Sequence, residues 1–351
     1  MAAFTAIDDP EAFFQTVIYT GNGSANNAIT LPGDTDMQPD LVWIKNRDAT
    51  DGHCLFDAVR GATKLLDPAE TAAETTDADT LDSFTSDGFQ VDADVKVNTD
   101  AEKYVAWCWK AGTTSGISTD GNETLTLGGY SFNQTSGVSI IKYTGTTGTT
   151  DKFPHGLGVA PKMVIVKDLD GTGFWSTYHH RMASDAETDF VRLNNTTAAE
   201  DDLTMWYDTV PTAYNVTLGT GSQVNGTGNY MAYIFSEKQG FSKFGSYHGN
   251  GNAEGPFVYT GFRPAFVMTK SIESTSSWHM FDNKREGYNK DNDPLEADAT
   301  TVEATTDMID ILSNGFKFRI ATDPNVAENY IYAAFAEAPF VNSNGVPCNA
   351  R

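Results

Sequence analysis

Short segments of consecutive apolar and β-branched residues recur along the whole chain, separated by polar stretches rich in Gly, Asn, Asp and Thr. Three of them are apolar on both alternating faces, which is typical of central strands buried on both sides. They are Tyr104–Trp109, Tyr230–Phe235 and Tyr330–Phe335. Short strands bounded by turn residues predict an all-β fold of antiparallel, β-sandwich-like sheets with little helix.

One strand-like phrase occurs three times at fixed internal spacing. A Pro is followed six residues later by a Lys, at Pro39–Lys45, Pro161–Lys167 and Pro264–Lys270. An aromatic residue follows each Lys after 11 residues, at Phe56, Tyr178 and Phe281. Three residues before these aromatics stand His53, Trp175 and Trp278, and an Arg follows the Lys after 15, 14 and 15 residues, at Arg60, Arg181 and Arg285. Such spacing predicts three diverged copies of one unit, with the three lysines at equivalent places.

The copies also share a beginning and an end. Each starts with a strand that ends in a Gly-containing turn, at Tyr19–Gly23, Tyr143–Gly145 and Tyr247–Gly251, where a positive φ is tolerated. Each ends with the doubly apolar strand described above. Asp87–Phe89 and Asn314–Phe316 predict a further turn and strand in the first and third copies.

These patterns divide the chain into five parts. We expect β-repeat units at residues 1–112, 130–239 and 240–342, a polar linker at 113–129, and a C-terminal tail at 343–351. The few helix candidates are Asp8–Phe14 and part of Pro68–Thr80, where a loop is an equal alternative because Asp and Thr favour turns.

Net charge and hydropathy restrict the kinds of partner that we expect, and the cysteine content indicates the compartment of assembly. The net charge of −24 argues against nucleic acid and anionic membranes, which need clustered Lys and Arg. No apolar run approaches the length needed to cross a bilayer, so no membrane insertion is expected. Three scattered cysteines, Cys54, Cys108 and Cys348, predict free thiols, two of them buried, in a protein assembled in a reducing cytoplasm.

The common signatures of catalysis and cofactor binding are missing, so we expect neither a catalytic site nor a cofactor nor a metal centre. His179-His180 point to opposite faces of a strand, and the acidic turns at Asp168/Asp170 and Asp291/Asp293 lack the ligand spacing of a calcium loop, although an isolated calcium ion stays an alternative.

Two further sets of residues remain as candidates for contacts. The lysines of the repeated phrase are expected to pair with neighbouring carboxylates rather than to form a recurrent binding site. Aromatic rings in polar stretches outside the shared phrases are candidates for contact with a ligand or partner, since exposed rings stack on sugars or anchor interfaces. These are Trp206, Tyr207 and Tyr288.

Several longer phrases carry a resemblance to a known group of proteins. They are Tyr19–Gly23, Gln38–Arg47, Phe241–Tyr247, Gly255–Pro264 and Ala336–Pro347. Together they resemble the tail-fibre-like structural proteins of marine bacteriophages, over essentially the whole chain. The resemblance implies a virion component but transfers no catalytic or binding residue.

The expected function is therefore that of a non-catalytic bacteriophage virion surface protein, a tail fibre or tail-associated component serving host attachment. A capsid decoration or cement protein is one alternative, and a carbohydrate-binding lectin or polysaccharide depolymerase is another. The expected partners are other virion proteins, further copies in a homo-oligomer, and a host surface glycan or receptor. The expected location is the virion, assembled in the host bacterial cytoplasm.

Overall fold

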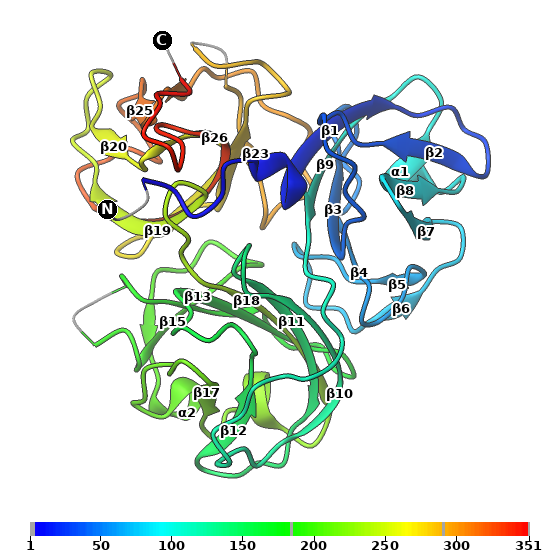
Figure 1. The fold of residues 1–351 in the computed structure, drawn as a ribbon, viewed down its shortest axis with the longest axis vertical. Helices are drawn as coiled ribbons and strands as arrows, with labels where there is room; N and C mark the ends of the chain where they lie inside the picture. The colour runs from blue at the N-terminus through cyan, green and yellow to red at the C-terminus, as the bar shows by residue number, and fades with distance from the viewer. Residues whose placement is uncertain (1–3, 183–184, 290–291, 350–351) are drawn as a thin grey trace.

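The computed structural model describes residues 4–182, 185–289 and 292–349, and antiparallel β-sheets dominate it (Figure 1). The predicted all-β, β-sandwich-like fold is thereby confirmed. Figure 1 shows three lobes around a common centre, which we call unit 1 (residues 14–109), unit 2 (126–235) and unit 3 (242–339). Each unit consists of a large sheet and a smaller second sheet.

The large sheets share one strand order. In unit 1 it is β1-β9-β3-β4, in unit 2 β11-β18-β13-β14 lies within a larger sheet, and in unit 3 it is β19-β26-β21-β22. The bounds are β1 (Phe14–Thr20), β3 (Leu41–Asn46), β4 (Cys54–Asp57), β9 (Lys103–Trp109); β11 (Val138–Thr144), β13 (Met163–Asp168), β14 (Ser176–His179), β18 (Asn229–Phe235); β19 (Ser242–His248), β21 (Phe262–Ser271), β22 (His279–Asp282) and β26 (Asn329–Pro339).

The register also agrees among the three sheets. Lys45 lies opposite Val105, Lys167 opposite Met231 and Lys270 opposite Ile331. Each of these partners follows the first tyrosine of its doubly apolar strand by one residue. The three lysines therefore occupy the same rung of their ladders.

The remaining strands complete the sandwiches and extend the sheets. The smaller sheets have the orders β2-β8-β7, β12-β17 and β20-β25-β24, while β10, β15, β16 and β23 extend large sheets and β5 pairs with β6. Their bounds are β2 (Asn27–Thr30), β5 (Lys64–Leu65), β6 (Thr75–Thr76), β7 (Leu81–Thr85), β8 (Gly88–Val91), β10 (Thr126–Asn133), β12 (Asp151–Pro154), β15 (Asp189–Arg192), β16 (Glu200–Asp201), β17 (Asn215–Leu218), β20 (Phe257–Tyr259), β23 (Leu295–Glu296), β24 (Ile309–Leu312) and β25 (Gly315–Phe318).

Helical structure is brief in the described part of the chain. It comprises a 3-10 turn at Pro10–Ala12 and single-turn helices α1 (Val95–Asn98), α2 (Leu203–Trp206) and α3 (Ser222–Asn225). The expected helix at Asp8–Phe14 is thus only the short 3-10 turn, and Pro68–Thr80 forms loop and strand, the alternative that its Asp and Thr favoured. No helix among the described residues is long and apolar enough to cross a membrane.

The boundary between units 1 and 2 differs in detail from the expected linker. Strand β10 begins at Thr126, inside the stretch predicted as linker, and passes through an irregularity at Gly128 before it continues along β11. Gly128 and Gly129 thus lie within this strand, where its register shifts. Units 2 and 3 follow each other closely, and the N-terminal segment bonds to their junction through Ala6 N–H and Gln239 C=O at 2.8 Å.

Two buried faces explain why the central strands are apolar throughout. In β3, Val42 and Ile44 face the interior of unit 1, together with Phe89 of its smaller sheet. Leu41 and Trp43 face the other way, into a core shared by all three units. The outer face of each large sheet is therefore covered by the neighbouring units, and the chain uses many of its aromatic residues there.

Candidate functional site

The shared core at the centre of the three lobes is lined by equivalent residues from each unit. Trp109 in β9, Phe235 in β18 and Phe335 in β26 occupy equivalent positions and lie around the same small apolar cavity of about 30 Å³. Ala333 also lines this cavity and stands where units 1 and 2 carry Trp107 and Tyr233. Its small side chain leaves space that a larger ring would fill.

Polar contacts between the units form a cyclic series. The indole N–H of Trp107 in unit 1 donates to Asp282 of unit 3 at 3.2 Å. The hydroxyl of Tyr233 in unit 2 donates to Asp57 of unit 1 at 2.9 Å. At the third interface His179 of unit 2 bonds the carbonyl of Tyr332 at 3.2 Å. In each case the last strand of one unit contacts the final residue of β4, β14 or β22 in the next unit, although the third contact uses a backbone carbonyl.

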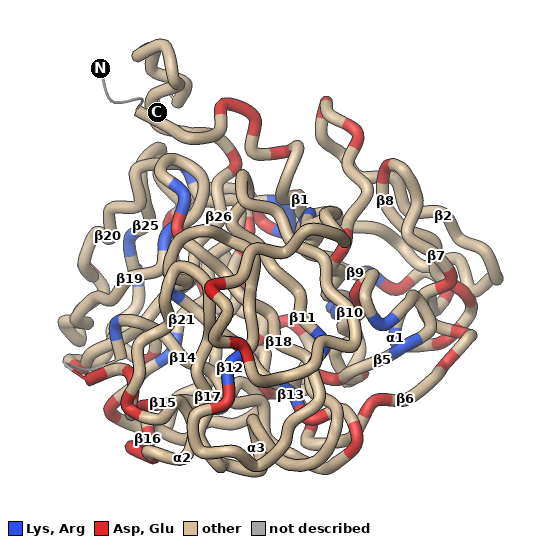
Figure 2. Tube along the Cα trace, turned by 60° about the horizontal axis from the view of Figure 1, so that its bottom comes forward, with Lys and Arg blue, Asp and Glu red and all other residues tan. Residues whose placement is uncertain are grey.

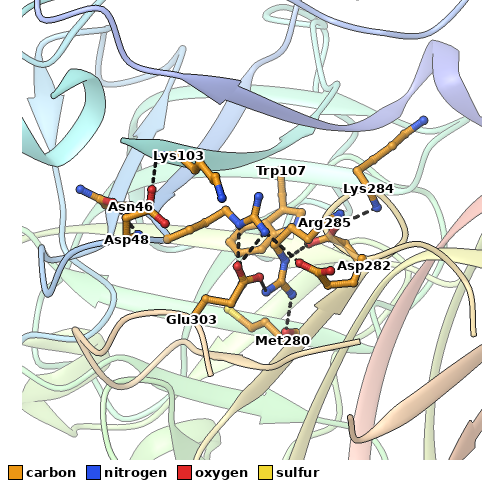
Figure 3. Close-up of polar contacts among 11 residues, drawn as sticks. Asn46, Asp48, Lys103, Trp107, Met280, Asp282, Lys284, Arg285 and Glu303 are labelled. Atoms are coloured by element: carbon orange, nitrogen blue, oxygen red, sulfur yellow. Dashed lines mark hydrogen bonds and ion pairs between the residues drawn. The ribbon is translucent and has the colours of Figure 1, made fainter. Parts of the chain in front are cut away.

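The carboxylates in this series are neutralised by buried arginines. Arg60 Nε donates to Asp57 at 2.5 Å and Arg285 Nε to Asp282 at 2.6 Å, and all four side chains are almost fully buried. Figure 3 shows Arg285 between Asp282 and Glu303, with Trp107 adjacent. Glu303 also accepts from Arg47 at 2.7 Å, which extends the network from unit 3 into unit 1.

Unit 2 replaces the ion pair by neutral groups, and this corrects the alignment made from the sequence. Asp57 and Asp282 are each followed after three residues by their arginine, whereas His179 is followed after three residues by Met182, which is buried. Arg181 is exposed instead. Burial lowers the pKa of His179 to about 3, so the imidazole is neutral at pH 7.

A second ring of contacts anchors a loop of each unit on its neighbour. Trp175 donates to the carbonyl of Glu70 at 3.1 Å, and Trp278 to that of Arg192 at 2.8 Å. His53, the counterpart of these tryptophans, lies 3.0 Å from the carbonyl of Glu296. The repeated His/Trp position predicted from the sequence therefore contacts the backbone of the neighbouring unit.

The repeated lysines have a different role from the expected one. Lys167 Nζ donates to the carbonyls of Thr71 and Gly173, both at 3.0 Å, and Lys270 Nζ to those of Thr196 and Ser276. Lys45 Nζ bonds the carbonyl of Asn46 at 2.7 Å. The expected pairing with carboxylates is wrong, because the ammonium groups are buried among loop carbonyls that need donors.

These buried lysines make stability depend on pH. Burial lowers the pKa of Lys45, Lys167 and Lys270 to about 8, from an ordinary value of 10.5. Above pH 8 the folded lysines lose their protons before the unfolded chain does, so the cost of the buried charge disappears and their contribution to stability rises towards pH 10. We expect the unfolding free energy of the wild type, relative to Lys167→Met, to rise by up to about 1.4 kcal/mol per pH unit in this window.

Urea unfolding at several pH values between 7 and 10 measures this difference. The buried thiols of Cys54 and Cys108, whose pKa burial raises, contribute equally to both proteins and cancel. A difference that stays constant with pH would contradict the buried charge at Lys167.

The three aromatic candidates lie in different environments. Trp206 is only 1% exposed, and its indole N–H donates to the carbonyl of Asp189. Its ring packs on Tyr178 because α2 lies against the sheet, so Trp206 is a core residue and not a ligand contact. Tyr207 follows α2 in a left-handed conformation (φ 53°) and is exposed.

Tyr288 lies in a surface pocket of about 260 Å³ formed with Arg263 and Ile311. Its hydroxyl donates to Glu337 at 2.5 Å, and the Arg263 guanidinium lies 4.9 Å from its ring centre. The structure thus brings none of the three aromatic candidates together in one site. Contact of Tyr207 or Tyr288 with a ligand stays a prediction.

One repeated polar residue was missed from the sequence. Asn98, Asn225 and Asn325 are fully buried, and each accepts from the backbone of the Gly-containing turn of its own unit, at Asn22, Thr146 and Asn250. They stand six, five and five residues before the tyrosine that begins the last strand. That near-constant spacing was the signal available in the sequence.

The acidic turns are organised by hydrogen bonds. Asp168 accepts from the N–H groups of Asp170 and Gly171, and Asp170 accepts from Asn229. Asp291 lies outside the described residues. Within the described ranges, no group of three or more His, Cys, Asp or Glu side chains is placed to hold a metal ion. The cysteines of this part are free thiols, with Cys54 and Cys108 buried and Cys348 exposed.

Two grooves run beside edge strands at the interfaces between units. The first, of about 540 Å³, lies between β1 and unit 3 and is lined by Ile18, Arg47, Lys103 and Arg285, among others. The second, of about 330 Å³, lies between β19 and unit 2 and is lined by Lys162, Arg181, Lys243 and Ser246, among others. We call them the β1 groove and the β19 groove.

The family model described as "Domain of unknown function (DUF7483)" matches residues 9–339 and so spans all three units. No curated protein and no solved structure matches the chain significantly.

Proposed function

We propose that this chain, which belongs to the DUF7483 family, is a non-catalytic surface protein of a bacteriophage particle, a tail fibre or tail-associated component that serves host attachment. The observation that supports a structural role is the use made of the repeated residues. Lys167, Lys270, the repeated His/Trp position and the carboxylates of the Asp–Arg pairs take part in hydrogen bonds that join one unit to the next. Such a body suits a part that must keep its shape in an assembly.

A second candidate is a capsid decoration or cement protein. The described chain forms three lobes around one centre and closes on itself, since the N-terminal segment bonds to the junction of units 2 and 3 (Figure 1). A compact body of this kind suits a lattice position on a head as well as a place on a tail. Location on the particle distinguishes the two candidates.

The proposed partners are other virion proteins, further copies of this chain, and a host surface glycan or receptor. The interfaces between units bury many of the aromatic residues of the chain, so its aromatic content does not by itself argue for an oligomer. Exposed apolar side chains such as Phe257 and Tyr259 on β20 offer contact area for another chain. Acidic residues are spread over the outer loops, which disfavours nucleic acid as a partner (Figure 2).

Labelling of intact particles tests the proposed role. An antibody against this chain, followed by electron microscopy, should mark the tail, and purified protein should bind particles that lack it. Label on the head would instead establish the decoration role. Absence from particles, together with failure to bind them, would overturn both.

A sugar-release assay tests the remaining rivals. We expect purified protein to release no reducing sugar from isolated host envelope polysaccharide, and light scattering to find an oligomer. Steady release of reducing sugar would instead support a polysaccharide depolymerase. If the protein binds the glycan but is absent from particles, the result would support a lectin that acts on its own.

A further inference from the structure

Among the described residues, one of three equivalent sheet edges is filled by a strand of the chain itself. In unit 2, β10 pairs with the outer side of β11 over seven residue pairs. The equivalent strands β1 and β19 stand at the edges of their sheets, bonded only to β9 and β26 in the described structure. Free edge strands present N–H and C=O groups to which another extended chain can bond.

The β19 groove lies where β10 lies in unit 2. Gly129 of β10 pairs with Lys142 and packs towards Val59, in the turn after β4 of unit 1. Lys142 precedes Tyr143 as Ser246 precedes Tyr247 in β19. The turn after β14, at Arg181, faces the β19 groove in the same way. A strand in the β19 groove would therefore repeat a packing that the chain already uses once.

Backbone groups of β19 remain available along this edge. The backbone carbonyl of Phe244 accepts from His180 at 2.8 Å, and its N–H donates to Glu237 at 3.4 Å. The backbone groups of Phe244 therefore point away from β26, although both already have partners. Outward-facing residues alternate along an antiparallel strand, so Ser246 and His248 also face outward. Both are exposed. They offer a short ladder for an added strand.

The β19 groove carries a surplus of positive charge in a chain whose net charge is −24. Lys243 pairs with Glu237 at 3.1 Å, but Lys162 and Arg181 have no ion-pair partner among the described residues. Unit 1 has Asp40 at the place of Lys162, and unit 3 has Ala265. This surplus is therefore particular to unit 2.

The β1 groove provides the contrast. Its arginines Arg47 and Arg285 are bonded to Glu286, Glu303 and Asp282, so their charge is compensated. Lys103 is the exposed cation there, without an ion-pair partner in the described structure. Both grooves lie beside an edge strand, but they differ in the compensation of their positive charge.

We propose that the β19 groove binds an extended acidic segment of a partner protein, which adds as a strand to the outer edge of β19. Its backbone would bond Ser246 and His248, and its carboxylates would pair with Lys162 and Arg181. Alternate side chains of a strand point to the same face, so a segment with acids at every second position fits this pattern. The proposal is independent of the particle on which the chain acts.

Peptide binding tests the proposal directly. The probes are a synthetic peptide in which glutamate alternates with valine, its counterpart with glutamine, and free glutamate and glucuronate at matched carboxylate concentration. We expect the glutamate peptide to bind the full chain in calorimetry and the other three probes to bind at least about tenfold more weakly.

Four variants locate the binding and its mode. Arg181→Glu and Lys162→Glu should each weaken binding of the glutamate peptide roughly tenfold, and Ser246→Pro, which removes an outward N–H, should do the same. Lys103→Glu in the β1 groove is the matched control and should leave binding unchanged. Unchanged urea unfolding identifies the variants that remain folded.

Each contrary result overturns the proposal. If the glutamate peptide does not bind, or if the glutamine peptide binds equally well, the groove does not recognise an acidic segment. If Lys103→Glu weakens binding of the glutamate peptide as much as the other variants do, the peptide does not bind in the β19 groove. Full binding in Ser246→Pro, or competition by glucuronate as effective as by the peptide, would indicate a simple carboxylate or acidic-sugar site without strand addition.

Discussion

Replacing Trp107 by Ala should lower the free energy of unfolding by about 3–5 kcal/mol, because a large buried ring leaves a cavity that its neighbours fill only in part. Trp107 is fully buried, and its ring centre lies 5.5 Å from that of Phe266 in unit 3 and 6.2 Å from that of Trp43. The same change removes a donor from the buried Asp282. Urea unfolding at pH 7 gives the difference.

Two companion variants separate ring packing from hydrogen bonding. Trp107→Phe keeps an aromatic ring but loses the indole N–H, and should cost clearly less, about 1–3 kcal/mol. Tyr259→Ala removes a ring that is 59% exposed and should change stability by less than about 0.5 kcal/mol. Full stability of Trp107→Ala would mean that the ring does not join units 1 and 3 as the structure places it.

Strand identity and register were predictable because both follow from local pattern. A strand buried on both faces must be apolar at every position, so Tyr104–Trp109 and its two counterparts could be identified without a structure. The fixed spacing from Lys45, Lys167 and Lys270 likewise reflects one register in three sheets. The sequence could not say that other units of the same chain cover the outer faces.

Side-chain roles were less predictable where they depend on a neighbouring unit. Lys167 bonds the carbonyl of Thr71 from unit 1, a contact that no local pattern encodes. Arg181 was aligned with two buried arginines by residue type, whereas the turn geometry gives their place to Met182, one position further on. A shift of one residue there exchanges a buried side chain for an exposed one.

The different environments of Trp206 and Tyr207 could not be predicted from the sequence around them. Trp206 and Tyr207 are adjacent in a polar stretch, yet the single turn of α2 directs one ring into the core and leaves the other exposed. Polarity of the surrounding sequence indicates a surface segment but not the direction of each side chain. That direction follows from the packing of α2 against β15 and β17.

Replacing Arg285 by Met should be the most damaging change to the polar network. It would leave the fully buried carboxylate of Asp282 without its cation, although Trp107 and the backbone N–H groups of Lys284 and Arg285 would still donate to it (Figure 3). Breaking a buried ion pair on one side costs about 3–5 kcal/mol, because an uncompensated charge stays in the interior. Urea unfolding at pH 7 measures the loss.

The double variant Asp282→Asn/Arg285→Met should recover most of that stability, since it removes both charges and keeps an acceptor for Trp107. Unit 2 already uses neutral groups, His179 and Met182, at this place. Lys317→Met, which breaks the exposed pair with Glu254, is the control and should cost less than about 1 kcal/mol. If the double variant were as unstable as the single one, the charge of Arg285 would not be what stabilises the interface between units 1 and 3.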